Sequence, residues 1–290
     1  MRVRLLVVTM MLAMAVAACG KKEDKATPVA TPTVTFNHTR VPLGSPIEVT
    51  YKFQVAQTAA LSKNYRVMVH FLDADDELMW TDDHNPPVPT SQWKAGQTVE
   101  YKRTVFVPFY PYVGDATVAI GLYEQGGAER LPLAGETAGQ RSYRVARLRL
   151  QPQTDNIFLA YVDGWNNPET AADNQIIEWQ WTKKDASIRF RNPKRNATFY
   201  LHYDGQPAMF DSPQTVNVYV RDAVVDTFQV TGTEETIRRV ALTAAQFGAE
   251  EMVTIRIAVD KTFVPALAKT GSKDVRELGI RVFHAFVDPQ

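Results

Sequence analysis

A short polar segment carries the residue types best suited to chemistry. Asp82, Asp83 and His84 are consecutive residues within the run Trp80–Pro87. Carboxylate oxygens suit hard cations, imidazole suits transition metals, and both groups serve in acid–base catalysis. Three neighbours in one loop rarely converge on a single ion, and the sequence has no His-x-x-x-His pair, cysteine pair or EF-hand loop to complete a site. We therefore predict no metal site and no cofactor.

The prolines that follow favour a structural role for these side chains. Pro86, Pro87 and Pro89 indicate a stiff loop crossing between sheets, where Asp and His side chains commonly bind backbone groups. The other histidines stand alone, and the sequence has no Gly-x-Ser-x-Gly elbow or phosphate-binding glycine loop. These absences favour a protein that is not an enzyme. Because a pair of glycosidase carboxylates needs no local motif, a hydrolase using Asp82 or Asp83 is the alternative.

Aromatic side chains are the second set of candidates. A proline-rich segment at residues 107–113 is surrounded by Trp80 and Trp93, with Phe106, Phe109, Tyr110 and Tyr112, and Trp165 lies near the start of the second half of the chain. Exposed aromatic faces stack on sugar rings, and proline-flanked tyrosines make rigid anchors for protein partners. The alternative, packing in a core, is favoured for each ring taken singly. The candidate binding residues are Trp80, Asp82, Asp83, His84, Trp93, Tyr110, Tyr112 and Trp165.

The chain's single cysteine, Cys19, has the most specific sequence context. Arg2 and Arg4 form a positive start, and the apolar run Leu5–Val16 leads to Ala17-Ala18-Cys19. A run of about a dozen apolar residues is too short for a membrane-spanning helix, which needs about 20. The layout therefore predicts a secretory signal peptide rather than a membrane anchor helix.

The run Val16-Ala17-Ala18-Cys19 resembles the lipobox of bacterial lipoproteins. The resemblance implies that residues 1–18 are removed and that the Cys19 thiol carries lipid, with acyl chains such as palmitate. Several chains on one cysteine give a durable membrane anchor. Acylation also explains a lone cysteine in an oxidising envelope, and it leaves the mature chain without disulfides. An ordinary signal with Ala-x-Ala-type cleavage is the alternative.

The residues after Cys19 predict a tether and a destination. Residues 19–33 are rich in charge and proline and lack apolar periodicity, which is typical of a flexible linker. Gly20 stands where an aspartate commonly retains such lipoproteins in the inner membrane. We therefore expect anchoring to the cell envelope, with the outer membrane favoured over the inner.

The composition of the 290-residue chain indicates folded domains and disfavours nucleic acid as a partner. Hydrophobic residues make up 45% and charged residues 22%, which is typical of globular proteins. Lys+Arg and Asp+Glu balance at 32 each, so loss of the signal leaves a net charge of about −2. Such a chain has no basic field to hold a polyphosphate backbone.

Period-two patterns predict an all-β protein with two antiparallel β-sandwich domains. In Ile47–Val55 every second residue is apolar and the residues between are polar, as in a half-buried strand. Several such strands separated by turn clusters indicate an immunoglobulin-like sandwich over residues 34–151. The rhythm resumes after about residue 168, and a second sandwich is expected over residues 152–290.

The second half also resembles a known module. The runs Val259–Ala266 and Asp274–Val282, with Gly164-Trp165 and Asn192-Pro193, are similar to a jelly-roll-like β-sandwich of bacterial envelope and glycosyltransferase-associated proteins. The resemblance implies a jelly-roll-like fold and, by analogy, glycan binding, but it transfers no ligand residues.

These observations support two hypotheses about function. The first is a non-catalytic, membrane-anchored envelope lipoprotein that binds a protein partner or a glycan and supports polysaccharide assembly or export. The second is an envelope glycan hydrolase with carboxylates near Asp82 and Asp83. The second requires those residues on one concave wall beside an acid from the other domain.

Overall fold

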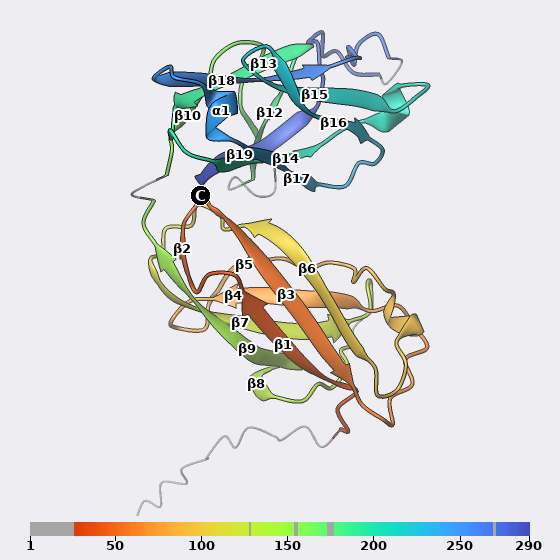
Figure 1. Cartoon of the computed structure of the whole chain (residues 1–290). Helices are drawn as coiled ribbons and strands as arrows, with labels where there is room; N and C mark the ends of the chain where they lie inside the picture. Colours follow the sequence, from red (N-terminus) through yellow and green to blue (C-terminus); the bar gives the residue numbers. More distant parts are fainter. Residues whose placement is uncertain (1–25, 128, 154–155, 173–176, 269–270) are drawn as a thin grey trace, which may run out of the picture.

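The structure is a computed structural model that describes residues 26–127, 129–153, 156–172, 177–268 and 271–290. It consists of two β-sandwiches that follow one another along the chain, and the C-terminus lies at the junction between them (Figure 1). The predicted signal peptide and Cys19 lie outside the described residues. Within the described ranges, no helix is long and apolar enough to cross a membrane.

The first sandwich has a three-stranded sheet in the order β1-β3-β6 and a larger sheet in the order β2-β9-β7-β4-β5, with β8 beside β9. Its pairs are antiparallel except for β2 and β9, which run parallel. The strands are β1 (Ala30–Phe36), β2 (Arg40–Pro42), β3 (Pro46–Val55), β4 (Arg66–Leu72), β5 (Leu78–Thr81), β6 (Thr98–Phe106), β7 (Gly114–Tyr123), β8 (Glu136–Gly139) and β9 (Ser142–Gln151).

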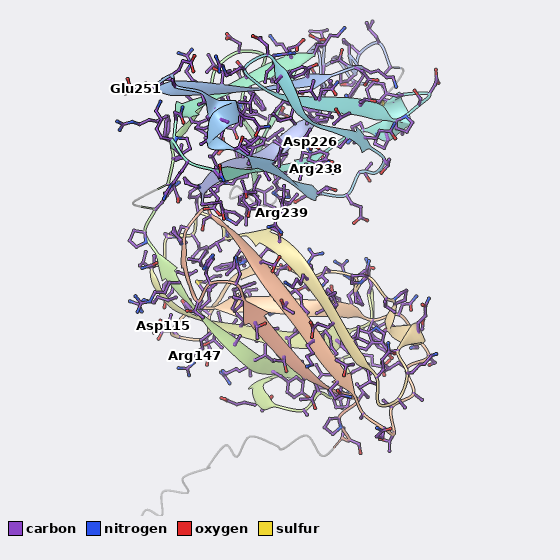
Figure 2. All side chains as sticks on the ribbon, in the orientation of Figure 1. Asp115, Arg147, Asp226, Arg238, Arg239 and Glu251 are labelled. Atoms are coloured by element: carbon purple, nitrogen blue, oxygen red, sulfur yellow. The ribbon has the colours of Figure 1, made fainter. Side chains whose placement is uncertain are left out.

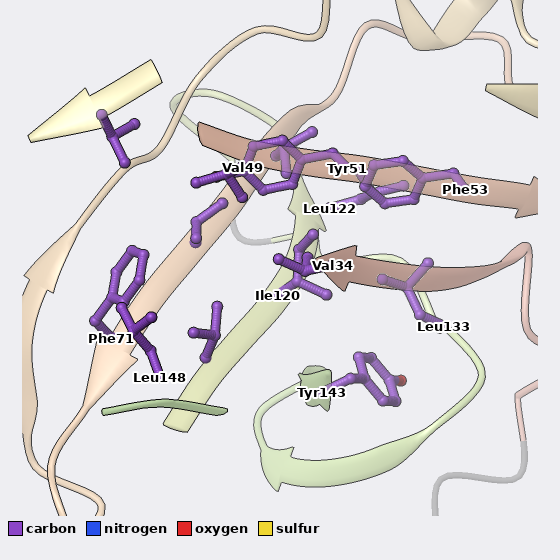
Figure 3. Packing of buried hydrophobic residues seen from close by; sticks show 14 of the residues in the cluster. Val34, Val49, Tyr51, Phe53, Phe71, Ile120, Leu122, Leu133, Tyr143 and Leu148 are labelled. Carbon is purple, nitrogen blue, oxygen red and sulfur yellow. The ribbon is translucent and has the colours of Figure 1, made fainter. Parts of the chain in front are cut away.

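The alternation in β3 explains how the first sandwich forms its core. Val49, Tyr51 and Phe53 are fully buried, whereas the residues between them face outward, as the period-two pattern predicts. Figure 3 shows them facing Ile120 and Leu122 of β7 across the space between the two sheets. Each large apolar side chain buried in this way stabilises the fold by about 1.5–3 kcal/mol.

The first sandwich begins earlier than the sequence predicts. Strand β1 starts at Ala30, which is buried and pairs with Val55 of β3. Residues 30–33, assigned to the tether, therefore belong to the sheet. The start of β1 could not be recognised from the sequence, because it continues a charged and proline-rich stretch. The outward residues of β1 are threonines, and its inner face includes Pro32.

The second sandwich consists of two five-stranded sheets, in the orders β10-β13-β18-β15-β16 and β11-β12-β19-β14-β17. A single helical turn, α1 (Ala244–Phe247), follows β17 and is capped by the side chain of Thr243. The strands are β10 (Leu159–Tyr161), β11 (Glu169–Thr170), β12 (Glu178–Trp181), β13 (Asp185–Arg191), β14 (Ala197–Asp204), β15 (Gln214–Val220), β16 (Ala223–Val230), β17 (Thr236–Leu242), β18 (Met252–Val259) and β19 (Arg281–Pro289). The all-β, two-sandwich fold predicted from the sequence is confirmed.

One face of the β11-β12-β19-β14-β17 sheet turns toward the first sandwich. Alternate residues of β14 point into the core of the second sandwich, and His202 lies on the opposite face. The ring of Phe106, at the end of β6, lies 5.9 Å from that of His202 and 4.6 Å from that of His284, measured between centroids. Arg239, seen at the junction in Figure 2, pairs with Glu48 at 3.4 Å. This sheet face positions the candidate site.

Candidate functional site

A hollow of about 520 Å³ lies at the junction of the two sandwiches. We call it the aromatic cleft, because five of its lining residues are Phe, Tyr or Trp. The first sandwich contributes β5 and the segment after β6, and the second contributes β12, β14 and β19. Its lining residues are Gly44, Leu78, Met79, Trp80, Thr81, Phe106, Val107, Pro108, Phe109, Tyr110, Ile177, Glu178, His202, Glu235, Phe283 and His284.

The aromatic rings of the cleft are held in place by specific contacts. Trp80 stacks with one face on Phe71, with centroids 4.4 Å apart and planes 12° apart, so its other face and edges remain for a ligand. Phe109 is 53% exposed, although its ring contacts His284 edge-on at 5.5 Å. Its position depends on Gly44, because a Cβ atom there would lie 2.3 Å from the Phe109 ring.

A second hollow of about 470 Å³ continues from the cleft, and we call it the polar groove. It shares Trp80, Thr81, Phe106, His202 and Glu235 with the aromatic cleft, so the two form one continuous depression. The remaining lining residues are Asp82, Arg103, Thr104, Val105, Thr236 and Ile237. A ligand in this depression meets aromatic surface at one end and charged groups at the other.

Asp82 lines the polar groove but is fully engaged by its neighbours. Its Oδ1 accepts from Arg103 Nη2 at 3.0 Å, and its Oδ2 accepts from Arg103 Nε at 3.2 Å and from the Tyr51 hydroxyl at 2.9 Å. Burial, and then the Asp82 charge, raises the pKa of Tyr51 far above its usual range, so the phenol remains a hydrogen-bond donor. The arrangement fixes Asp82 and Arg103 as one ion pair in the groove wall.

His202 and Glu235 form a second polar pair, where the cleft and groove meet. His202 Nε2 lies 2.9 Å from Glu235 Oε2, and the His202 ring packs between Phe106 and Phe283. The hydrogen bond from His202, reinforced by the nearby Arg281 charge, lowers the pKa of Glu235. Glu235 is therefore an ionised carboxylate at neutral pH, and not the protonated group that a general acid requires.

The other two residues of the predicted acid–histidine cluster lie outside both hollows. Asp83 Oδ1 accepts the backbone N–H of Val69 at 2.8 Å. His84 is buried, with Nδ1 2.7 Å from the Asp82 carbonyl and Nε2 2.8 Å from the Tyr101 hydroxyl. Because a carbonyl only accepts, Nδ1 carries the proton and Nε2 accepts from Tyr101. Burial lowers the pKa of His84, which is consistent with this neutral ring.

The predicted aromatic candidates divide into two groups. Trp80 and Tyr110 come together in the cleft, although Trp80 lies in strand β5 and not in the loop that the sequence indicated. Trp93 is only 5% exposed, packs on Phe53 and donates from Nε1 to Val88, so it belongs to the core. The rest make structural contacts elsewhere: Tyr112 donates to the Asp115 carbonyl, and Trp165 Nε1 donates to the Ser187 carbonyl.

The sequence patterns did not single out several other cleft residues, chiefly Glu178, His202, Glu235 and Phe283. The position of Phe283 could have indicated the site from the sequence. Phe283 occupies an outward position on its strand, where a face exposed to solvent would carry a polar side chain. An aromatic residue at such a position indicates a face that another part of the protein covers. Among the described residues, no group of three or more His, Cys, Asp or Glu side chains is placed to hold a metal ion.

Comparisons with known proteins give structural neighbours but no family. No protein-family model and no curated protein matches the chain. A carbohydrate-binding module, CBM36, in complex with calcium and xylotriose is 11% identical, with a TM-score of 0.27 over 46% of this chain and 100% of that chain. A tandem CBM22 domain from Paenibacillus barcinonensis is 11% identical, with a TM-score of 0.25 over 86% of this chain and 79% of that chain.

A larger enzyme is also among the structural neighbours. A β-glucuronidase from Bacteroides uniformis is 11% identical, with a TM-score of 0.31 over 89% of this chain but only 30% of that chain. The TM-scores of all three neighbours lie below 0.5. They assign no function to this chain, whose function has to be inferred from its own cleft.

Proposed function

We propose that this chain is a non-catalytic glycan-binding lipoprotein of the bacterial cell envelope. The observation that carries the proposal is the continuous depression between the sandwiches, aromatic in the cleft and charged in the groove. Sugars present apolar C–H faces and polar hydroxyl edges, so an aromatic wall beside fixed carboxylate and guanidinium groups suits both. A volume of about 520 Å³ lies in the range of ordinary ligand sites.

The proposed anchor is lipid on Cys19, and the outer membrane is the proposed destination. The support is the lipobox-like run before Cys19 and the Gly20 that follows it. Because β1 begins at Ala30, the tether from Cys19 has about eleven residues and reaches roughly 30 Å at about 3 Å per residue. Ala30 pairs with Val55, at the end of β3 away from Gly44 and the cleft, so the first sandwich stands between the tether and the cleft. The tether still keeps the chain at the membrane, which favours glycans of the envelope itself.

A glycan hydrolase is the second candidate, because Asp82 and Glu235 come from different sandwiches and line the same groove. The chemistry of the pair argues against it. Hydrolysis needs one carboxyl group kept protonated by a raised pKa, whereas the pKa of Glu235 is lowered and Asp82 is held by Arg103 and Tyr51. Asp83 and His84 lie outside the groove, so the wall that hydrolysis requires is incomplete.

A glycan array probed with the full-length, detergent-solubilised protein tests the proposal. We expect retention of a restricted set of glycans and the recovery of each bound glycan intact after prolonged incubation. No retention of any glycan would contradict the binding function. Release of shortened products, lost in the Glu235→Gln variant, would replace the proposal with the hydrolase.

A further inference from the structure

The charged residues that line the two hollows are mostly acidic. Their linings contain three carboxylates, Asp82, Glu178 and Glu235, and a single guanidinium, Arg103, with no lysine. Leaving the histidines aside, the depression therefore carries a surplus of negative charge. This surplus bears on the charge of a glycan that binds there.

The pairing of these groups shows where the surplus lies. The charge of Arg103 is balanced by Asp82, which accepts two of its five N–H donors, so this pair adds no net charge to the depression. Glu235 is paired with His202. Across the part of the chain that the structure describes, Glu178 has no ion-pair partner, and it lies at the aromatic end. An unpaired carboxylate beside aromatic walls is the setting in which a cation binds best.

The aromatic cluster already holds one cation. The Arg281 guanidinium lies 4.9 Å from the ring centroid of Phe283, which lines the cleft, and 4.9 Å from that of Trp179. It forms an ion pair with Asp204 outside the cleft lining, and its charge also acts on Glu235, whereas no ion pair joins it to Glu178 among the described residues. Aromatic faces attract cations through their negative π-surfaces.

We propose that the aromatic cleft selects glycans that carry free, protonated amino groups, with Glu178 as the carboxylate that faces the ammonium. The inference rests on the proposed glycan-binding function and adds the charge of the ligand to it. The rings of Trp80 and Phe109 contact the sugar, while Glu178 balances the charge of the ammonium. Among the described lining residues, Arg103 is the one permanent cation and is paired with Asp82, so uronic-acid glycans are disfavoured.

Two tetrasaccharides with the same backbone test the inference. The full-length protein is titrated at pH 6 and 0.15 M salt with the β-1,4-linked tetramer of glucosamine and with its fully N-acetylated counterpart, by calorimetry and by tryptophan fluorescence. We expect the free-amine tetramer to bind at least tenfold more tightly. Equal affinities, or tighter binding of the N-acetylated tetramer, would overturn the inference and leave the glycan-binding function intact.

Two matched variants test whether Glu178 supplies the negative charge that binds the amino group. Glu178→Gln keeps the size of the side chain and should reduce the preference for the free amine to threefold or less. Glu251→Gln, on the far end of the second sandwich in Figure 2, should leave it unchanged. A preference that persists in Glu178→Gln would overturn the role of this residue. The absence of binding to either tetramer, together with a blank glycan array, would overturn the proposed function itself.

Discussion

The Nε2 atom of His284, in the last strand of the second sandwich, lies 2.9 Å from the carbonyl oxygen of Gly44, which follows β2 in the first. Gly44 in turn leaves room for the Phe109 ring, and both residues line the aromatic cleft. One contact therefore joins the two sandwiches at the place where their surfaces form the site.

The protonation of His284 makes this junction sensitive to acid. Burial lowers the pKa of His284 to about 4, against about 6.5 in the unfolded chain. Between these values the unfolded chain binds more protons, so the stability present above pH 6.5 is lost as the pH falls to 4. The loss amounts to at most about 3 kcal/mol. Denaturant unfolding from pH 7 to pH 4 measures it.

Two variants separate His284 from the other titrating groups. His284→Gln keeps a donor for Gly44 and cannot charge, so its unfolding free energy should depend less on pH in this window. His38→Gln, at an exposed position, should behave like the unaltered protein. An unchanged pH dependence in His284→Gln would show that His284 does not titrate as described.

The ion pair of Asp82 and Arg103 is expected to stabilise the first sandwich more than an exposed pair does. Asp82→Asn removes the charge that balances Arg103 and replaces one of the two accepting oxygens by an NH2 donor that faces other donors, and should cost about 2–3 kcal/mol. The control is Asp115→Asn, whose partner is Arg149 and whose side chain is 71% exposed; it should cost about 0–1 kcal/mol. Equal losses in thermal or denaturant unfolding would contradict the structural role given to Asp82.

Because Gly44 leaves room for the Phe109 ring, we expect a substitution at Gly44 to weaken glycan binding even though it changes none of the side chains that contact the glycan. Gly44→Ala places a Cβ atom against the Phe109 ring and should weaken glycan binding about tenfold or more. Gly126→Ala has the same backbone strain, with φ of +77° against +78°, but open space around its Cβ. It should bind as the unaltered protein does. Equal binding by both alanine variants would show that Phe109 needs no such support.

The proposed lipid anchor is tested separately from the cleft. Cys19→Ala removes the only thiol of the chain and should abolish metabolic labelling with a palmitate analogue. The variant should also leave the membrane fraction or remain unprocessed. Labelling that persists in Cys19→Ala would contradict lipidation at this residue.

The two sandwiches could be predicted from the sequence because the alternation of apolar and polar residues within a single strand already indicates which of its faces is buried. Strand β3 alternates in and out as its residues do, so its core face follows from the pattern. Strand β17 alternates only over its last three residues, and β5 is only four residues long, so neither strand was predicted. The formation of a short or irregular strand depends on the strands it pairs with, so its own residues show little of the alternating pattern.

The site was harder to predict, because it depends on how two domains pack. Trp80 and Tyr110 were singled out from residue type and context, and both reach the cleft. Glu178 and Glu235 come from separate strands or turns of the other sandwich, and no spacing along the chain relates them to Trp80. Asp83 stood beside Asp82 in the sequence, yet a step of one residue turns its side chain away from the groove, to the Val69 N–H. His84 is two residues from Asp82 but is buried against Tyr51 and Tyr101.

The central claim is that glycans bind in the aromatic cleft, and Phe109 offers the most direct measurement. The tightest ligand from the array is titrated calorimetrically against the Phe109→Ala and Phe158→Ala variants. Both phenylalanines are exposed, at 53% and 84%, but only Phe109 lines the cleft. Loss of a stacking ring should weaken binding about tenfold in Phe109→Ala and leave it unchanged in Phe158→Ala. Unchanged affinity in Phe109→Ala would contradict the location of the site.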